Sequence, residues 1–139
     1  MNSAFILIGL TLMFTMFYKF RYFIVKHNVA IYLFTLITAF GVIIVGLING
    51  GNPLTSGYHT LGAVMAILGG NTLLILISRS MAEFGNFQKI TLVLGVFGMI
   101  GFWIMFFDLN NIYMPVFERL SVYTLVLWNF LAGVYILKN

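Results

Sequence analysis

The sequence predicts an all-α integral membrane protein, a single domain over residues 1–139 that folds as a bundle of five transmembrane helices. Hydrophobic residues make up 62% of the chain and charged residues only 7%, which leaves too little polar surface to cover a water-soluble globule. The apolar residues gather into five stretches, each long enough to cross a bilayer. Six of the seven Lys and Arg residues fall on one side of these stretches, which predicts an N-terminus outside and a C-terminus inside.

The uninterrupted apolar runs set the bounds of the expected helices. The first run is the shortest, but Lys19 and Arg21 can extend to the membrane surface and lengthen that helix. We expect a mature helix there and not a signal peptide, because the basic residues follow the apolar run instead of preceding it. The expected spans are Ser3–Tyr18, Val29–Ile48, Tyr58–Ser78, Ile90–Phe107 and Leu120–Leu137.

The distribution of basic residues gives the expected direction of each helix. Successive loops face alternate sides of a membrane, and Lys and Arg gather on the cytoplasmic side. Arg119 is the one cation on the opposite side, and the connections over residues 49–57 and 108–118 are then external. The six cations expected at the cytoplasmic surface are Lys19, Arg21, Lys26, Arg79, Lys89 and Lys138.

Small residues recur inside two of the spans. Because lipid gives no hydrophobic drive for helix association, helices approach closely where small side chains let their backbones meet. The third span carries such a ridge every four residues and the fourth carries one every three residues. The expected packing positions are Gly62, Ala66 and Gly70 in the third span, and Gly95, Gly98 and Gly101 in the fourth.

Two amides lie deep in the expected spans. Asn71 and Asn129 are at similar depth, and their helices run in the same direction, so they can reach each other. An unpaired amide in hydrocarbon is costly. We expect both to link helices, with a polar lining for a substrate path as the alternative.

Four polar residues flank the expected outer ends of the helices: His59, Asp108, Glu118 and Arg119. We interpret them as a structural clasp, in which a carboxylate accepts hydrogen bonds from His59 and Arg119. A lipid phosphate held by Arg119 and His59 is a second interpretation. A divalent ion or a general base at His59 is a third, although the spacing matches no known metal or catalytic signature.

The composition excludes several kinds of site. The chain has no Cys, so thiol nucleophiles and iron–sulfur ligands are absent. Its two histidines, His27 and His59, start spans at opposite faces of a bilayer about 30 Å thick and cannot share a haem. We therefore expect no cofactor, no metal and no catalytic residue. Nucleic acid is not an expected partner, because the basic residues lie beside apolar spans and anchor them.

Two stretches resemble a known family. They are 57–63, continuing to Gly69-Gly70-Asn71, and 118–123 followed by Trp128, and they resemble the prokaryotic membrane family catalogued as domain of unknown function 998. The resemblance implies a bacterial cytoplasmic membrane protein that lacks the first helix usual in the family. Its motifs fall on His59, Gly62, Ala63, Gly70, Asn71, Glu118, Arg119, Tyr123 and Trp128.

The sequence leaves three functional hypotheses. The first is a non-enzymatic multi-pass membrane protein that scaffolds or modulates another membrane component and binds lipid at its outer rim. Membrane lipid, a second copy of the chain or another membrane protein would be its partner. The second is a transporter or transporter subunit. The third is an enzyme that modifies lipid at the outer face through His59 and Glu118.

Overall fold

The computed structural model describes residues 2–48, 50–81, 85–108 and 114–138. In these ranges five helices are long and apolar enough to cross a membrane, which confirms the all-α, five-helix bundle. The first helix has three sections, and the other four are continuous. The elements are α1 Asn2–Phe14, η1 Thr15–Lys19, η2 Phe20–Tyr22, α2 Asn28–Leu47, α3 Ser56–Ser80, α4 Gly85–Phe107 and α5 Met114–Lys138.

The first helix is longer than its apolar run. After α1 the chain forms a π-helical turn, η1, and a 3₁₀ turn, η2, so that the membrane-spanning helix covers Ser3–Tyr22. The extension brings Phe20 into the bundle, where its side chain is fully buried. The wider π turn changes which side chains face the other helices. Helical structure past Tyr18 therefore serves packing as well as length.

The fifth helix begins at Met114, earlier than the expected start at Leu120. Glu118 and Arg119 therefore lie inside the first turns of α5 and not in the preceding connection. The backbone N–H of Met114 donates a hydrogen bond to the carboxylate of Asp108 at 3.0 Å. Pro115 occupies the first turn, where proline is tolerated because no N–H is needed there.

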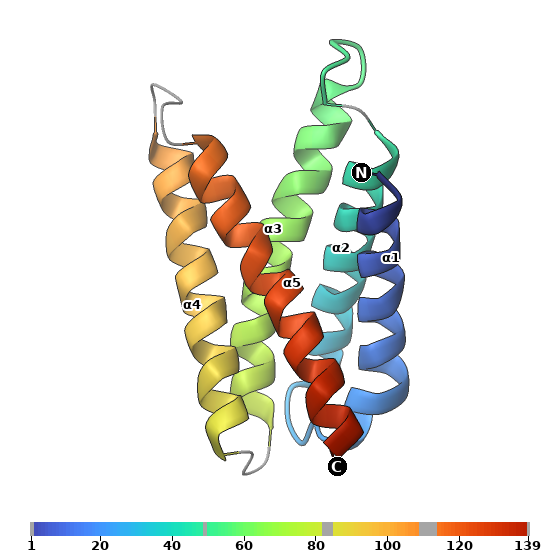
Figure 1. Ribbon diagram of the computed structural model, residues 1–139, viewed down its shortest axis with the longest axis vertical. Coiled ribbons are helices and arrows are strands. Elements are labelled where there is room, and N and C mark those ends of the chain that lie inside the picture. Colours follow the sequence, from blue (N-terminus) through green and yellow to red (C-terminus); the bar gives the residue numbers. More distant parts are fainter. Residues whose placement is uncertain (1, 49, 82–84, 109–113, 139) are drawn as a thin grey trace.

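The helices follow one another in space, and α5 then crosses the bundle (Figure 1). At one end of the bundle α5 begins beside α4. At the other end it reaches the side of the first helix and finishes at the C-terminus. The first end also carries the N-terminus, the connection from α2 to α3 and the connection from α4 to α5. We call it the His59 end and the opposite end the basic end.

The chain connections place the expected cationic residues together at the basic end. The connection from α1 to α2, the last turn of α3, the first turn of α4 and the end of α5 all lie there (Figure 1). Arg119 lies near the other end, in α5. The bundle thus has the two-sided cation distribution expected of a membrane protein.

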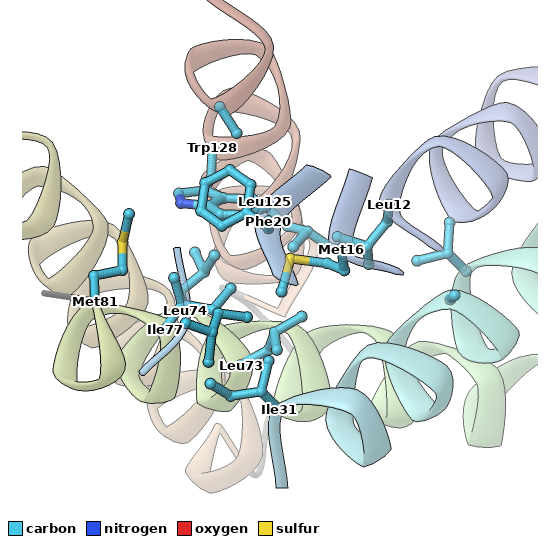
Figure 2. Packing of buried hydrophobic residues seen from close by; sticks show 14 of the residues in the cluster. Leu12, Met16, Phe20, Ile31, Leu73, Leu74, Ile77, Met81, Leu125 and Trp128 are labelled. Atoms are coloured by element: carbon cyan, nitrogen blue, oxygen red, sulfur yellow. The ribbon is translucent and has the colours of Figure 1, made fainter. Parts of the chain in front are cut away.

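The best-packed part of the core lies in the half of the bundle nearer the basic end. Figure 2 shows side chains from the first helix, α3 and α5 converging there. Phe20 and Trp128 are fully buried, with ring centroids 5.4 Å apart. The indole N–H of Trp128 donates to the hydroxyl of Thr91 on α4 at 3.1 Å. Val25 donates to the carbonyl of Ser80 at 2.9 Å, which ties the connection after η2 to the end of α3.

The small residues of the third span form the close contact between α2 and α3. A Cβ added to Gly41 on α2 would lie 2.7 Å from the carbonyl oxygen of Gly62 and 2.6 Å from the backbone nitrogen of Ala66. Gly70 faces both Thr38 on α2 and Leu125 on α5. A larger residue at Gly41 or Gly62 would therefore push the two backbones apart.

The glycines of α4 face α3 and α5. A Cβ at Gly95 would lie 3.0 Å from the carbonyl oxygen of Asn71, and one at Gly101 would lie 2.7 Å from the hydroxyl of Ser121. Gly98, between them, meets side chains of both helices. This row lets α4 seat against α3 and α5 together.

Candidate functional site

Asn71 lies at the centre of a buried hydrogen-bond network between α3 and α5. Its side chain is 1% exposed. Its amide Nδ2 donates to the carbonyl of Ile67 at 2.8 Å and to the carbonyl of Ser121 at 3.3 Å. Its Oδ1 accepts a hydrogen bond from the hydroxyl of Thr124 at 2.8 Å. Both amide atoms thus have partners inside the bundle.

The network reaches α4 through Ser121 and Gly98. The hydroxyl of Ser121 donates to the carbonyl of Gly98 at 2.9 Å. A Cβ at Gly98 would collide with Oδ1 of Asn71 and lie 2.6 Å from the hydroxyl of Thr124. We call Asn71, Gly98, Ser121 and Thr124 the polar junction. It joins α3, α4 and α5 by side chains that satisfy one another.

Asn129 takes no part in this junction, so the direct amide pair with Asn71 that the helix directions made possible is not formed. Its Nδ2 is buried and has no hydrogen-bond partner within the described ranges. On α5 the residues that bond Asn71 are Ser121 and Thr124, which precede Asn129 by one to two helical turns. The hydroxyl of Thr38 on α2 is likewise buried without a partner.

His59 is held against the end of α2 and not against a carboxylate. Its Nδ1 lies 2.7 Å from the carbonyl oxygen of Ile48, and its ring packs on Gly50, where a Cβ would lie 2.7 Å from Cδ2. His59 therefore fastens the start of α3 to the chain that leaves α2. The expected clasp between His59 and Glu118 or Asp108 has no such hydrogen bond among the residues that the structure describes.

Asp108 lies at the end of α4, with its carboxylate bonded to the N–H of Met114. It therefore caps the first turn of α5, where a negative charge is also stabilised by the positive end of the helix dipole. The residues between these two, 109–113, lie outside the described ranges, so most of the expected external connection there is not described. The role visible for Asp108 is to start α5.

Glu118 stands between two hollows at the His59 end. One is a largely enclosed cavity of about 60 Å³ between α1, α2, α3 and α5. The other is a more open cleft of about 330 Å³ that also reaches His59 on α3 and Met105 on α4. Ala63, Ile67 and Glu118 line both. Glu118 is half-buried, and among the described residues it has no hydrogen bond or ion pair.

The enclosed cavity is apolar apart from Glu118. Its walls include Phe5 and Ile8 of α1, and Val122 of α5. The cavity exists because α5 tilts away from α1 toward the His59 end, whereas Phe20 and Trp128 hold the two helices together near the basic end (Figures 1 and 2). The small side chain of Ala63 leaves room where a larger residue would fill it.

Arg119 points away from that cavity. Its side chain is exposed, and within the described part of the chain it makes no hydrogen bond or ion pair. Tyr123, one helical turn further along α5, is 62% exposed. Arg119 and Tyr123 are thus two exposed polar side chains one helical turn apart at the His59 end.

Of the four residues singled out from the sequence, the structure brings only His59 and Glu118 to one cleft. Asp108 caps a helix and Arg119 faces outward. Within the described ranges, no three His, Cys, Asp or Glu side chains are placed to hold a metal ion. No sequence motif predicts the apolar cavity, because the cavity arises from the divergence of helices.

Comparisons with protein-family models, with curated proteins and with solved structures found no match.

Proposed function

We propose that this chain is a non-enzymatic membrane protein that scaffolds or modulates another membrane component and binds lipid at its His59 end. The polar junction carries the first part of the proposal. Asn71, Ser121 and Thr124 direct their hydrogen bonds at one another and at Gly98, and so make a fixed unit of three helices. A fixed unit with exposed apolar faces suits a protein that supports a neighbour in the membrane.

Arg119 supports the lipid part of the proposal. A guanidinium binds phosphate through several N–H donors in a fixed plane, and this guanidinium is exposed with no partner among the described residues. Its place in the first turns of α5 puts it close to the expected headgroup layer. We propose an external face for this end, a bacterial cytoplasmic membrane for the protein, and kinship with the family catalogued as domain of unknown function 998.

Gentle extraction followed by native mass spectrometry tests the proposal. We expect the chain to leave the membrane with a second copy, another membrane protein or bound anionic lipid. Arg119→Gln should lower retention of phosphatidylglycerol added in mixed vesicles, while Lys89→Gln at the basic end serves as the matched control for loss of one charge. A monomer with neither partner nor lipid would contradict the proposal.

A transporter or transporter subunit is the second candidate, favoured by the orphan polar groups. The hydroxyl of Thr38 and the amide Nδ2 of Asn129 are buried without partners within the described ranges. Buried polar groups without partners often mark bound water or a polar path. Flux of solutes into liposomes that contain the purified protein would support this candidate, and tight liposomes would remove it.

A further inference from the structure

We infer that the cavity and cleft on either side of Glu118 form a binding site for a small hydrophobic ammonium, a primary amine carried directly on a short apolar group. This site is distinct from the lipid-phosphate contact proposed for Arg119. Three properties define it: a Glu118 carboxylate with no partner among the described residues, apolar walls and small hollows.

The carboxylate supplies the charge selectivity. Glu118 is half-buried and has no cationic or hydrogen-bonding partner among the described residues. Electrostatic attraction is stronger beside an apolar wall than in water. An ammonium that donates hydrogen bonds to this carboxylate would satisfy it.

The walls select an organic cation over a metal ion. Calcium and magnesium need several oxygen ligands, and within the described ranges no three acidic or His side chains meet. The enclosed cavity offers apolar carbon from four helices beside the carboxylate. An apolar pocket with one well-placed charged group is the usual form of a site for a small organic ligand.

The dimensions indicate a short apolar group. One water needs roughly 10–15 Å³ of cavity, so a cavity of about 60 Å³ accepts a short run of methylene groups and not a full acyl chain. The ammonium would lie at Glu118, facing the cleft of about 330 Å³ that His59 also lines. His59 is fixed by the carbonyl of Ile48 and so forms a rigid wall of this cleft.

The same geometry argues against phosphatidylethanolamine as the occupant. In that lipid a phosphate and a glycerol separate the ammonium from the acyl chains. With its ammonium at Glu118 and a chain in the cavity, the phosphate would be forced against apolar walls, where a charge is costly. The site therefore fits an amine attached directly to its apolar group.

Calorimetric titration of the protein in phosphatidylcholine nanodiscs tests the inference, with empty nanodiscs as the blank. The probes are hexylammonium, hexanol and hexanoate, which share a chain length and differ in charge. We expect hexylammonium to bind at least tenfold more tightly than the other two. Equal binding of the three probes, or no saturable binding of hexylammonium, would overturn the inference.

Three variants separate the parts of the site. Glu118→Gln should abolish the preference for the cation, whereas Arg119→Gln should keep it, because that side chain faces away. Ala63→Leu should weaken hexylammonium at least tenfold by filling the cavity, with thermal unfolding confirming that the bundle is intact. Unchanged binding in Glu118→Gln would overturn the assignment. If nanodiscs of phosphatidylethanolamine suppress hexylammonium binding, the lipid headgroup is the occupant and the amine proposed here is wrong.

Discussion

Oδ1 of Asn71 on α3 accepts a hydrogen bond from the hydroxyl of Thr124 on α5 at 2.8 Å, directly over the bare Cα of Gly98 on α4. Three helices therefore meet at this point, since Ser121 of α5 also donates to the carbonyl of Gly98. Removing the amide takes away the hydrogen bonds to Ser121 and Thr124 on α5, whereas adding a single methyl group to Gly98 displaces the amide. The predictions for Asn71 and Gly98 follow from this contact, and a substitution of Asn129, which lies outside it, serves as their comparison.

Asn71→Leu should lower the free energy of unfolding by about 1–2 kcal/mol. Interhelical hydrogen bonds in membrane proteins contribute about 0.6 kcal/mol on average and up to about 1.7 kcal/mol, and Asn71 bonds both Ser121 and Thr124. Reversible unfolding in mixed micelles measures the change. An unchanged stability would show that the junction does not hold the helices together.

Asn129→Leu is the matched substitution with the opposite expectation. Because Nδ2 of Asn129 is buried without a partner in the described ranges, Leu should leave the stability unchanged or raise it by about 1 kcal/mol. The same unfolding assay measures it. If the free energy of unfolding fell by more than about 1 kcal/mol, Asn129 would have to bind a partner molecule in the membrane. That result would favour assembly or a polar path.

Gly98→Ala should destabilise the bundle by about 1–3 kcal/mol, as expected for overpacking. Its Cβ would collide with Asn71 and lie 2.6 Å from the hydroxyl of Thr124. Gly133→Ala in α5 is the control, because nothing lies within 4 Å of the added Cβ. Alanine is also a better helix former than glycine at such a position. Equal effects of the two substitutions on unfolding would refute the role given to Gly98.

Thiol labelling should locate the His59 end outside the cell. The chain has no Cys, so a single introduced cysteine reports its own position. An impermeant maleimide added to whole cells should label Leu54→Cys. Leu54 lies in the connection from α2 to α3, and its side chain is 88% exposed. Asn86→Cys, at the start of α4, should react only after the membrane is opened. The reverse pattern would invert the assigned orientation.

The elements could be read from the sequence to different extents. The five helices were predictable because each apolar run is long enough to cross a bilayer by itself. The start of α5 was missed because Pro115 and the polar residues before Leu120 resemble a connection. Proline fits a first helical turn as well as a loop, and in the structure α5 starts at Met114, whose N–H donates to Asp108.

The candidate site was less predictable than the helices. Glu118 and His59 could be selected as polar residues at one end of the bundle, but the cavity beside Glu118 could not. That cavity depends on the angle at which α5 leaves α1, an angle set by contacts such as Phe20 with Trp128 far along the chain. Likewise, the sequence could not show that Thr124, and not Asn129, bonds Asn71.

The sequence by itself determined that the chain lies in lipid, how many helices cross it, and which ends share the cations. These properties depend on the free energy of transferring each segment from water to hydrocarbon and on the charges beside it. Both can be read from a single segment without its neighbours in space. Only the tertiary structure decided that Asn71 bonds Thr124, that His59 holds Ile48, and that Glu118 opens on a cavity. Lipid does not drive helices together as water does, so their tilt and pairing depend on close packing between distant segments.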